Sequence, residues 1–136
     1  MNKPIRVVIC TRQTLLREGL KALLAQGDPI EVAGEAVTAG EALALLGRLS
    51  PDVLLIEPLA SDLSSSEATR LITDTYPGIK VLLLCVNADV SLISGCLRAG
   101  ASGYIGSYDR SIELKDAIFT ACGQQTDRSH AAGARG

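Results

Sequence analysis

Aromatic side chains are almost absent from this sequence. Of its 136 residues, 3% are aromatic: one is Phe, three are Tyr and none is Trp. Apolar residues nevertheless make up 47% of the chain, so its core must be built from Leu, Ile, Val and Ala. Such a composition is typical of a parallel β-sheet covered by helices on both faces. The length fits one domain and is too short for two ordinary ones.

Metal-ligating residues are also scarce. The sequence has a single histidine, His130, and its four cysteines, Cys10, Cys85, Cys96 and Cys122, lie far apart with no CxxC motif. A zinc site needs clustered Cys and His ligands, so we expect no metal and no cofactor. In a cytosolic setting the cysteines should be free thiols, most of them packed as small apolar side chains.

An excess of positive charge is missing as well. Thirteen Lys and Arg residues face fifteen Asp and Glu residues, for a formal net charge of -2. The chain alone therefore lacks a positive field that would neutralise many nucleic-acid phosphates. We therefore expect the chain alone to bind nucleic acid poorly.

Long apolar runs and a secretion signal are the last absences. No apolar run approaches the length of about 18 residues that would span a membrane. The N-terminal segment MNKPIRVVIC has no basic region followed by a long apolar core and a small-residue cleavage site. We expect a cytoplasmic protein with no membrane contact.

What the sequence does contain is an alternation of short apolar runs and helical patterns. The predicted strands are 5–10, 30–36, 52–56, 80–85 and 103–105. The predicted helices are about 13–25, a segment after Thr38, 67–75, 88–99 and 111–122, with a loop at 57–66. This alternation predicts an α/β fold with a doubly wound parallel (βα)5 sheet.

Local signals place two helix ends and one domain boundary. Thr38 and Glu41 form a capping box at the start of the second helix. Gly100 stands where the C-terminal glycine of the fourth helix belongs. From Gly123 onward the sequence has no periodicity and little to bury. We therefore divide the chain into a domain at 1–122 and a disordered tail or linker at 123–136.

The residues that follow the strands are the candidate site, because doubly wound sheets bind ligands beyond the carboxyl ends of their strands. This carboxyl end of the sheet includes Thr11, Arg12, Glu57, Cys85 and Ser107. It offers one carboxylate and one guanidinium, whereas Mg²⁺ prefers several anionic oxygens. We expect Arg12 to occupy the cation position and to pair with Glu57. Such a pair has about 1 to 4 kcal/mol of attraction before desolvation and entropy are subtracted.

A series of segments along the chain resembles the receiver domain of bacterial response regulators. In order, they are IRVVIC, QTLLREGLKALLA, EVAGEAVTAGEALALL, PDVLLIE, EATRLI, YPGIKVLLL and LRAGASGYI, which cover about residues 4 to 122. The sequence is most similar to receivers of the LuxR/NarL type, whose output is a helix-turn-helix. The resemblance implies a CheY-like, flavodoxin-like fold with strand order 2-1-3-4-5.

The resemblance also assigns roles at the carboxyl end of the sheet. Receivers bind Mg²⁺ with an acidic pair and phosphorylate an aspartate, and a hydroxyl and a lysine complete the pocket. In this sequence the acidic pair falls on Thr11 and Arg12, the phosphoacceptor on Glu57, the hydroxyl on Cys85 and the lysine on Ser107. Every position departs from the pattern, so we predict a receiver that does not depend on phosphorylation.

Two other roles of Glu57 remain open. It could be phosphorylated itself, or it could imitate a phosphorylated aspartate, because its extra methylene moves the carboxylate outward by roughly 1.5 Å. The imitation is partial, since a phosphoryl group has a charge of roughly -1.5 to -2 and three acceptor oxygens. Tyr104 falls on the aromatic switch position of the family, but Cys85 is a weak hydrogen-bond donor. Tyr104 is either a weakly coupled switch or a partly exposed edge aromatic.

The expected function is that of a regulatory dimerisation or protein-interaction module of a transcriptional regulator. Receivers often dimerise through the fourth helix, fifth strand and fifth helix, or through the first and last helices. We favour the former face, with a homodimer interface at Leu92, Ile93, Cys96 and Leu97. The alternative is a small-molecule ligand sensed at the vacated phosphorylation site. An enzyme is not expected, because no base lies within reach of a nucleophile.

Overall fold

Strands and helices alternate along the chain, as predicted. The computed structural model describes residues 3–26, 29–58, 65–85, 90–106 and 111–123. The strands are β1 (Ile5–Cys10), β2 (Ile30–Ala36), β3 (Val53–Ile56), β4 (Lys80–Leu84) and β5 (Gly103–Ile105). The helices are α1 (Thr14–Leu24), α2 (Ala39–Leu49), α3 (Ser65–Thr75), α4 (Val90–Arg98) and α5 (Ser111–Ala121). The predicted tail from 124 onward lies outside the described residues.

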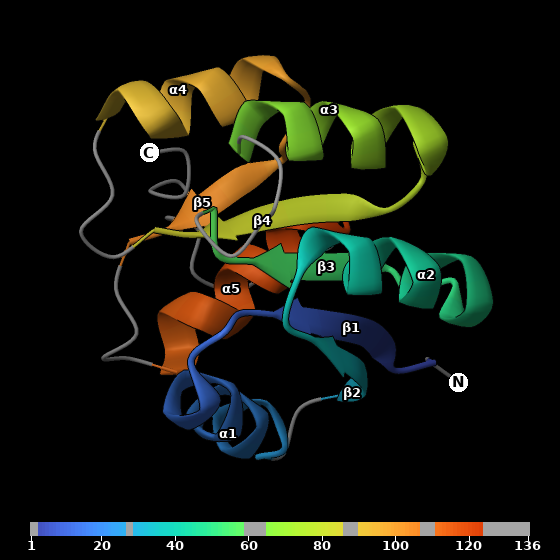
Figure 1. Cartoon of the computed structure of the whole chain (residues 1–136). Coiled ribbons are helices and arrows are strands. Elements are labelled where there is room, and N and C mark those ends of the chain that lie inside the picture. Colours follow the sequence, from blue (N-terminus) through green and yellow to red (C-terminus); the bar gives the residue numbers. More distant parts are fainter. Residues whose placement is uncertain (1–2, 27–28, 59–64, 86–89, 107–110, 124–136) are drawn as a thin grey trace.

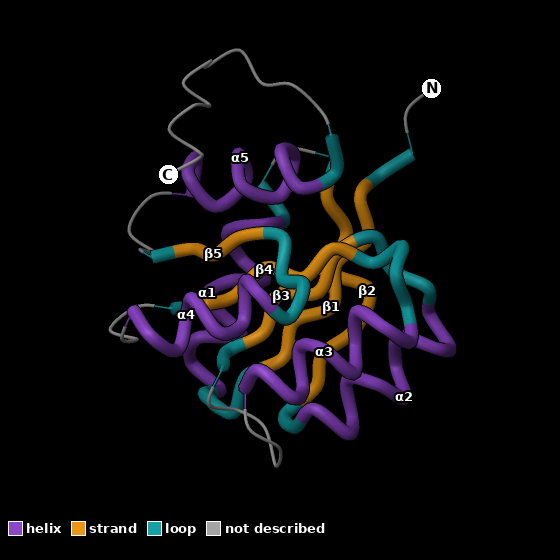
Figure 2. The backbone as a smooth tube through the Cα atoms, turned by 90° about the horizontal axis from the view of Figure 1, so that it is seen from above, coloured by secondary structure: helices purple, strands orange, loops and turns teal. Residues whose placement is uncertain are grey.

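The five strands form one parallel sheet in the order β2-β1-β3-β4-β5. Figure 2 shows them in this order, from β2 at one edge to β5 at the other. The doubly wound sheet and its strand order are thus confirmed. β1 pairs with β2 on one side and with β3 on the other, so the segments that follow β1 and β3 are neighbours.

Helices cover both faces of the sheet, and each face has its own apolar core (Figure 1). α1 and α5 pack on one face, and α2, α3 and α4 pack on the other. The largest fully buried side chains are all aliphatic: Val7, Ile9, Leu20, Leu24, Leu46, Leu54, Leu55, Ile72, Leu83, Leu84, Leu114 and Ile118. Among the described residues, no helix combines the length and apolar character needed to cross a membrane.

Helix α2 begins with the capping box that the sequence predicts. Oγ1 of Thr38 accepts a hydrogen bond from the amide of Glu41 at 3.1 Å. The carboxylate of Glu41 in turn accepts one from the amide of Val37 at 2.8 Å. The reciprocal bond therefore reaches one residue beyond the N-cap, and two amides at the entry to the helix are satisfied by side chains.

Helix α3 begins earlier than predicted, because Ser65 belongs to the helix and not to the loop at 57–66. The hydroxyl of Ser65 donates a hydrogen bond to the carbonyl of Pro58. The carbonyl of Ser65 accepts one from Oγ1 of Thr69 at 2.9 Å. The first of these bonds ties the start of α3 to the residue that follows Glu57, and the second lies within the helix. The predicted start of the fourth helix at 88 lies outside the described residues, which resume at Val90.

Gly100 ends α4 in the manner that the sequence predicts. Its φ is 120°, a conformation that side chains rarely adopt. A Cβ at this position would lie 2.7 Å from Oγ1 of Thr73 on α3. The same hydroxyl donates a hydrogen bond to the carbonyl of Ala99 at 3.0 Å. The end of α4 can approach α3 this closely only because residue 100 lacks a side chain.

We predict that Gly100→Ala lowers the free energy of unfolding by about 1 to 3 kcal/mol, through its positive φ and its contact with Thr73. Gly19→Ala should raise it by about 0.5 to 1 kcal/mol, because glycine is unfavourable inside a helix. An added Cβ on Gly19 or Gly78 would meet nothing within 4 Å, so Gly78→Ala is a suitable control. Urea denaturation measures the free energy of unfolding of all three variants. An unchanged value for Gly100→Ala would contradict the strain at this position.

Candidate functional site

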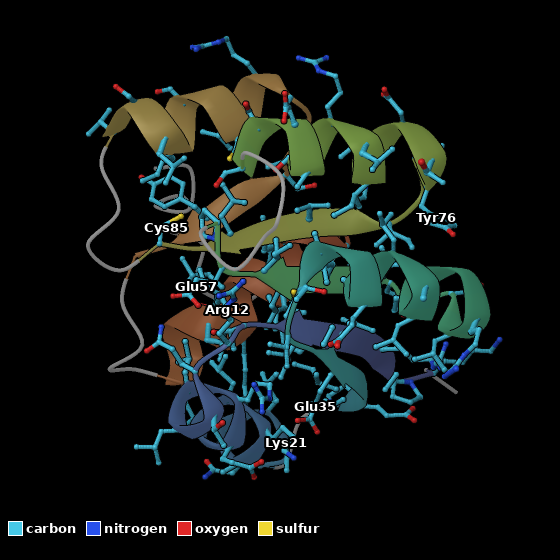
Figure 3. All side chains as sticks on the ribbon, viewed as in Figure 1. Arg12, Lys21, Glu35, Glu57, Tyr76 and Cys85 are labelled. Carbon is cyan, nitrogen blue, oxygen red and sulfur yellow. The ribbon has the colours of Figure 1, made fainter. Side chains whose placement is uncertain are left out.

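The candidate site lies where the chain leaves β1, β3 and β4. Thr11 and Arg12 follow β1, Glu57 follows β3 and Cys85 follows β4. Figure 3 shows Arg12, Glu57 and Cys85 at the same end of the sheet. Because β1, β3 and β4 are neighbours in the sheet, the structure brings these predicted residues together. Ser107, which was predicted to join them, lies outside the described residues.

Glu57 is held by two neutral hydrogen-bond donors from the junction between β1 and α1. Oγ1 of Thr11 donates to Oε1 of Glu57 at 2.5 Å, and Nε2 of Gln13 donates to Oε2 at 2.6 Å. Such short distances are typical of hydrogen bonds to a charged acceptor. We call Thr11, Gln13 and Glu57 the carboxylate clamp, because both carboxylate oxygens are engaged in it.

Gln13 is a residue of the clamp that the sequence pattern did not indicate. It occupies the N-cap position of α1, yet its side chain makes no capping hydrogen bond. The side chain is instead directed to Glu57, while the backbone amide of Gln13 donates to Oγ1 of Thr11 at 3.1 Å. Its position two residues beyond Thr11 was the available signal, since any side chain there starts close to the carboxyl end of β1.

The predicted ion pair between Arg12 and Glu57 is wrong. The ion pairs seen between described side chains include those of Glu35 on β2 with Arg17 and Lys21 on α1, and one between Glu18 and Lys21. Arg12 is exposed and takes no part in them. The clamp already gives each carboxylate oxygen a hydrogen-bond donor, and an exposed ion pair would add only about 0 to 1 kcal/mol. The guanidinium of Arg12 would therefore gain little free energy by leaving water to pair with Glu57.

The residues at this end do not fit the magnesium ion that the resembling family binds. Within the described residues, there is no group of three or more His, Cys, Asp and Glu side chains that could hold a metal. Thr11 is neutral and fully buried, Arg12 is cationic, and both oxygens of Glu57 are engaged. A divalent ion here would find few of the anionic oxygens that it prefers.

Cys85 and Tyr104, the two described switch positions, are not connected to the clamp by hydrogen bonds. Both side-chain hydrogen bonds of Glu57 go to the β1–α1 junction. Cys85 is 5% exposed, and its burial raises the pKa of the thiol to about 11. The thiol is therefore neutral near pH 7 and is a weak donor. Tyr104 is 42% exposed on the edge strand β5.

A charged network joins α1 to β2 beside the clamp. Nη1 of Arg17 donates to the carbonyl of Thr11 at 2.7 Å, and Nε of Arg17 lies 3.3 Å from Oε1 of Glu35. Nζ of Lys21 lies 2.8 Å from Oε2 of the same carboxylate. Figure 3 shows the side chains of Lys21 and Glu35 next to each other. The bond between them is the main reason that the pKa of Glu35 is lowered and the pKa of Lys21 is raised. The sequence pattern indicated neither the hydrogen bond of Arg17 to Thr11 nor the ion pairs of Glu35 with Arg17 and Lys21.

The predicted interface on α4 needs one correction. Cys96 is fully buried and belongs to the core between α4 and the sheet, so it is not a surface residue of this domain. Leu92 and Ile93 are half-buried, and Leu97 is 38% exposed. The helix is apolar on more than one side, and its pattern alone could not show which side faces the sheet.

The chain resembles curated transcriptional regulators, although no protein-family model matches it. It is 36% identical over 101 residues to the transcriptional regulatory protein DegU of Brevibacillus brevis, covering 74% of this chain and 43% of that protein. It is 32% identical over 117 residues to the transcriptional regulatory protein LiaR of Bacillus subtilis (strain 168), covering 86% and 56%. The chain thus spans about half the length of these relatives.

The fold has the same architecture as a solved response regulator. The crystal structure of a two-component response regulator of the LuxR family from Aurantimonas sp. SI85-9A1 matches with a TM-score of 0.80 and 25% identity. The match covers 98% of this chain and 99% of that one. With this architecture and the two curated relatives, the chain is a response regulator receiver domain of the CheY-like fold, homologous to transcriptional regulators of the LuxR/NarL family.

Proposed function

We propose that this receiver domain is a phosphorylation-independent module, which holds a dimer or a protein partner as part of a cytoplasmic transcriptional regulator. The observation that carries the proposal is the carboxylate clamp, in which neutral donors of the same chain engage both oxygens of Glu57. A carboxylate held in this way is a poor metal ligand and a poor nucleophile. The domain then acts by binding and not as an enzyme.

The charge distribution at the carboxyl end of the sheet supports the same proposal. Phosphoryl transfer is catalysed mainly by positioning and by metal ions that offset the charge of the transferred group. Here Thr11 and Arg12 stand at the positions where the resembling family has an acidic pair. The metal ion would lose two carboxylates and meet a nearby positive charge, so the catalyst for phosphorylation has no site.

Permanent imitation of a phosphorylated state is less well supported. A phosphoryl group presents three acceptor oxygens to its surroundings. Glu57 presents two, and both are directed to Thr11 and Gln13. The thiol of Cys85 is neutral near pH 7, because its pKa is raised by burial. Glu57 therefore stabilises an arrangement of its own at the β1–α1 junction.

We propose self-association through the face that α4 and β5 form. Val90 and Leu97 on α4 and Tyr104 on β5 are 78%, 38% and 42% exposed. They make up three of the six large apolar side chains that the described part of the chain exposes. Apolar side chains gathered on one face favour association, because their burial removes apolar surface from water.

DNA binding is proposed for an output domain outside this chain. The two relatives are named transcriptional regulatory proteins, and the chain spans about half of their length. With a net charge of -2, the receiver domain contributes little attraction to phosphates itself. In this arrangement the domain determines how two output domains are brought together.

A second candidate function is the sensing of an anionic small molecule, and Arg12 favours it. Its guanidinium is exposed at the carboxyl end of the sheet and takes part in none of the described ion pairs. Guanidinium groups bind carboxylates and phosphates through paired hydrogen bonds. Glu57 carries negative charge at the same end of the sheet, which weakens this candidate relative to the first.

The first prediction concerns phosphorylation. Incubation with acetyl phosphate and Mg²⁺ should produce no phosphoryl mass gain, and beryllofluoride with Mg²⁺ should leave the amide spectrum unchanged, because the described residues provide no group of anionic ligands for the metal. The triple variant Thr11→Asp, Arg12→Asp, Glu57→Asp, which restores three carboxylates, is the positive control and should show Mg²⁺-dependent shifts. A phosphoryl adduct on Glu57 of the unmodified chain would overturn the proposal. Shifts that depend on the anion but not on Mg²⁺ would favour the second candidate.

The second prediction concerns self-association. Leu97→Asp should raise the dimer dissociation constant by at least roughly tenfold, because it places a charge in an apolar interface. Leu71→Asp is the matched control, since Leu71 is 42% exposed on α3 and outside the proposed face. Sedimentation equilibrium measures both constants. A monomeric parent domain, or equal effects of the two variants, would rule out this face.

The third prediction concerns Cys85. Burial raises the pKa of its thiol from 9.0 to about 11, so at pH 8 its thiolate fraction is roughly 100-fold below that of an ordinary thiol. Iodoacetamide should label it at least that much more slowly in the folded than in the urea-unfolded chain, as measured by peptide mass. Because the unfolded chain ionises first, stability should fall as the pH rises from about 9 towards about 11. Rapid labelling of the folded chain would show that the thiol is not held neutral.

A further inference from the structure

The side-chain hydrogen bonds of Glu57 all run to one side of the candidate site. Both side-chain bonds lead to Thr11 and Gln13, which belong to the junction of β1 with α1. We infer that Glu57 is coupled through a relay centred on Thr11 to α1 and β2, and not to α4 and β5. The relay is a conformational device in which the state of one carboxylate determines how firmly α1 is held against the sheet.

Thr11 is the branching point of the relay, because each of its polar groups makes a hydrogen bond to a different residue. Its hydroxyl donates to Glu57 at 2.5 Å and accepts from the amide of Gln13 at 3.1 Å. Its backbone amide donates to the carbonyl of Ala36 at 3.1 Å. Its carbonyl accepts from Nη1 of Arg17 at 2.7 Å. Thr11 is fully buried, so water offers no replacement for any of these bonds.

Arg17 carries the relay from Thr11 to the second strand. Its side chain is 15% exposed, and its Nε lies 3.3 Å from the carboxylate of Glu35 on β2. Lys21, one turn further along α1, reaches the other oxygen of Glu35 at 2.8 Å and Glu18 at 3.2 Å. The contacts therefore run without a gap from Glu57 through α1 to β2.

No comparable route leads from Glu57 to the other side of the site within the described residues. Cys85 follows β4, but its contact with β5 is a backbone bond, from its amide to the carbonyl of Ile105 at 2.9 Å. Its thiol is buried and makes no hydrogen bond to Glu57. Tyr104 is 42% exposed on β5. Among the described residues, the side chain of Glu57 thus has hydrogen-bond partners at the β1–α1 junction and none on α4 or β5.

This inference builds on the proposed function, because a site that exchanged a phosphoryl group would break the clamp in every cycle. The two can nevertheless fail separately. Phosphorylation of Glu57 would overturn the proposed function and leave the direction of coupling to be measured. A coupling that runs to β5 would overturn the inference even if Glu57 never accepts a phosphoryl group.

Amide hydrogen exchange of the whole chain, monitored by NMR, tests the direction in which Glu57 is coupled. In Glu57→Gln, an NH₂ group replaces one of the two carboxylate oxygens. This group donates, so Thr11 and Gln13 no longer each have an acceptor oxygen of their own. In Thr11→Val, the shape is kept and the hydroxyl is lost. Both variants should speed exchange at the amides of Gln13 and Arg17 by roughly 3- to 10-fold, the ratio expected for one lost hydrogen bond. The amide of Arg17 is an apt reporter because it donates to the carbonyl of Gln13 at 3.0 Å.

Exchange at the amides of Cys85, Ala101 and Ser102 should stay within twofold of the parent chain. These amides donate to carbonyls of the β4, α4 and β5 region and report on the opposite side of the site. Cys85→Ala is the mirror control and should affect this region without affecting α1. Gly100→Ala is expected to destabilise the end of α4. It shows how general destabilisation changes the exchange rates of both groups of amides. Equal acceleration of the two sets in Glu57→Gln, or no acceleration at Gln13 and Arg17, would refute the relay.

Discussion

The carboxyl end of the sheet depends on one hydrogen bond, from the buried hydroxyl of Thr11 to the carboxylate of Glu57. At a separation of 2.5 Å, a second carboxylate in place of Thr11 would repel the first unless a cation or a proton lay between them. A neutral donor removes that repulsion and satisfies the acceptor directly. Thr11 and Glu57 thus depend on each other, because the hydroxyl is the donor that the carboxylate accepts.

The length of the side chain at position 57 also has a physical reason. Glu57 follows β3, whereas Gln13 stands at the start of α1 beyond the neighbouring strand. An aspartate would end one methylene earlier, so its carboxylate would lie roughly 1.5 Å short of the present position. That loss is large compared with the tolerance of a hydrogen bond. Glutamate can contact Thr11 and Gln13 at once, and the helix then starts with its N-cap side chain bound to the sheet instead of to its own backbone.

Much of the fold and the membership of the site could be predicted from the sequence, but the pairing of side chains could not. The bounds predicted for β2 and β5 from the apolar runs agree with the observed ones. Gly100 has the positive φ that its position after the fourth helix indicated. The carboxyl ends of parallel strands meet at one edge, which is why Thr11 and Glu57 were expected together. The partner of Glu57 was predicted from charge alone, which favoured Arg12. Burial and neutral donors decided otherwise, and they depend on side-chain directions that a sequence does not contain.

The direction of the Glu57 hydrogen bonds also bears on the relation between the carboxyl end of the sheet and the face of α4 and β5. A site can influence a distant face only if the contacts between them differ in two states. In the resembling family a hydroxyl at the position of Cys85 provides such contacts towards α4 and β5. Here that position holds a buried, neutral thiol, and the bonds of Glu57 lead to α1 instead. Among the described residues, no hydrogen bond of the Glu57 side chain leads to the exposed apolar residues of α4 and β5. A face of this kind suits constant association, whereas any regulation that acts through Glu57 must reach its partner by way of α1.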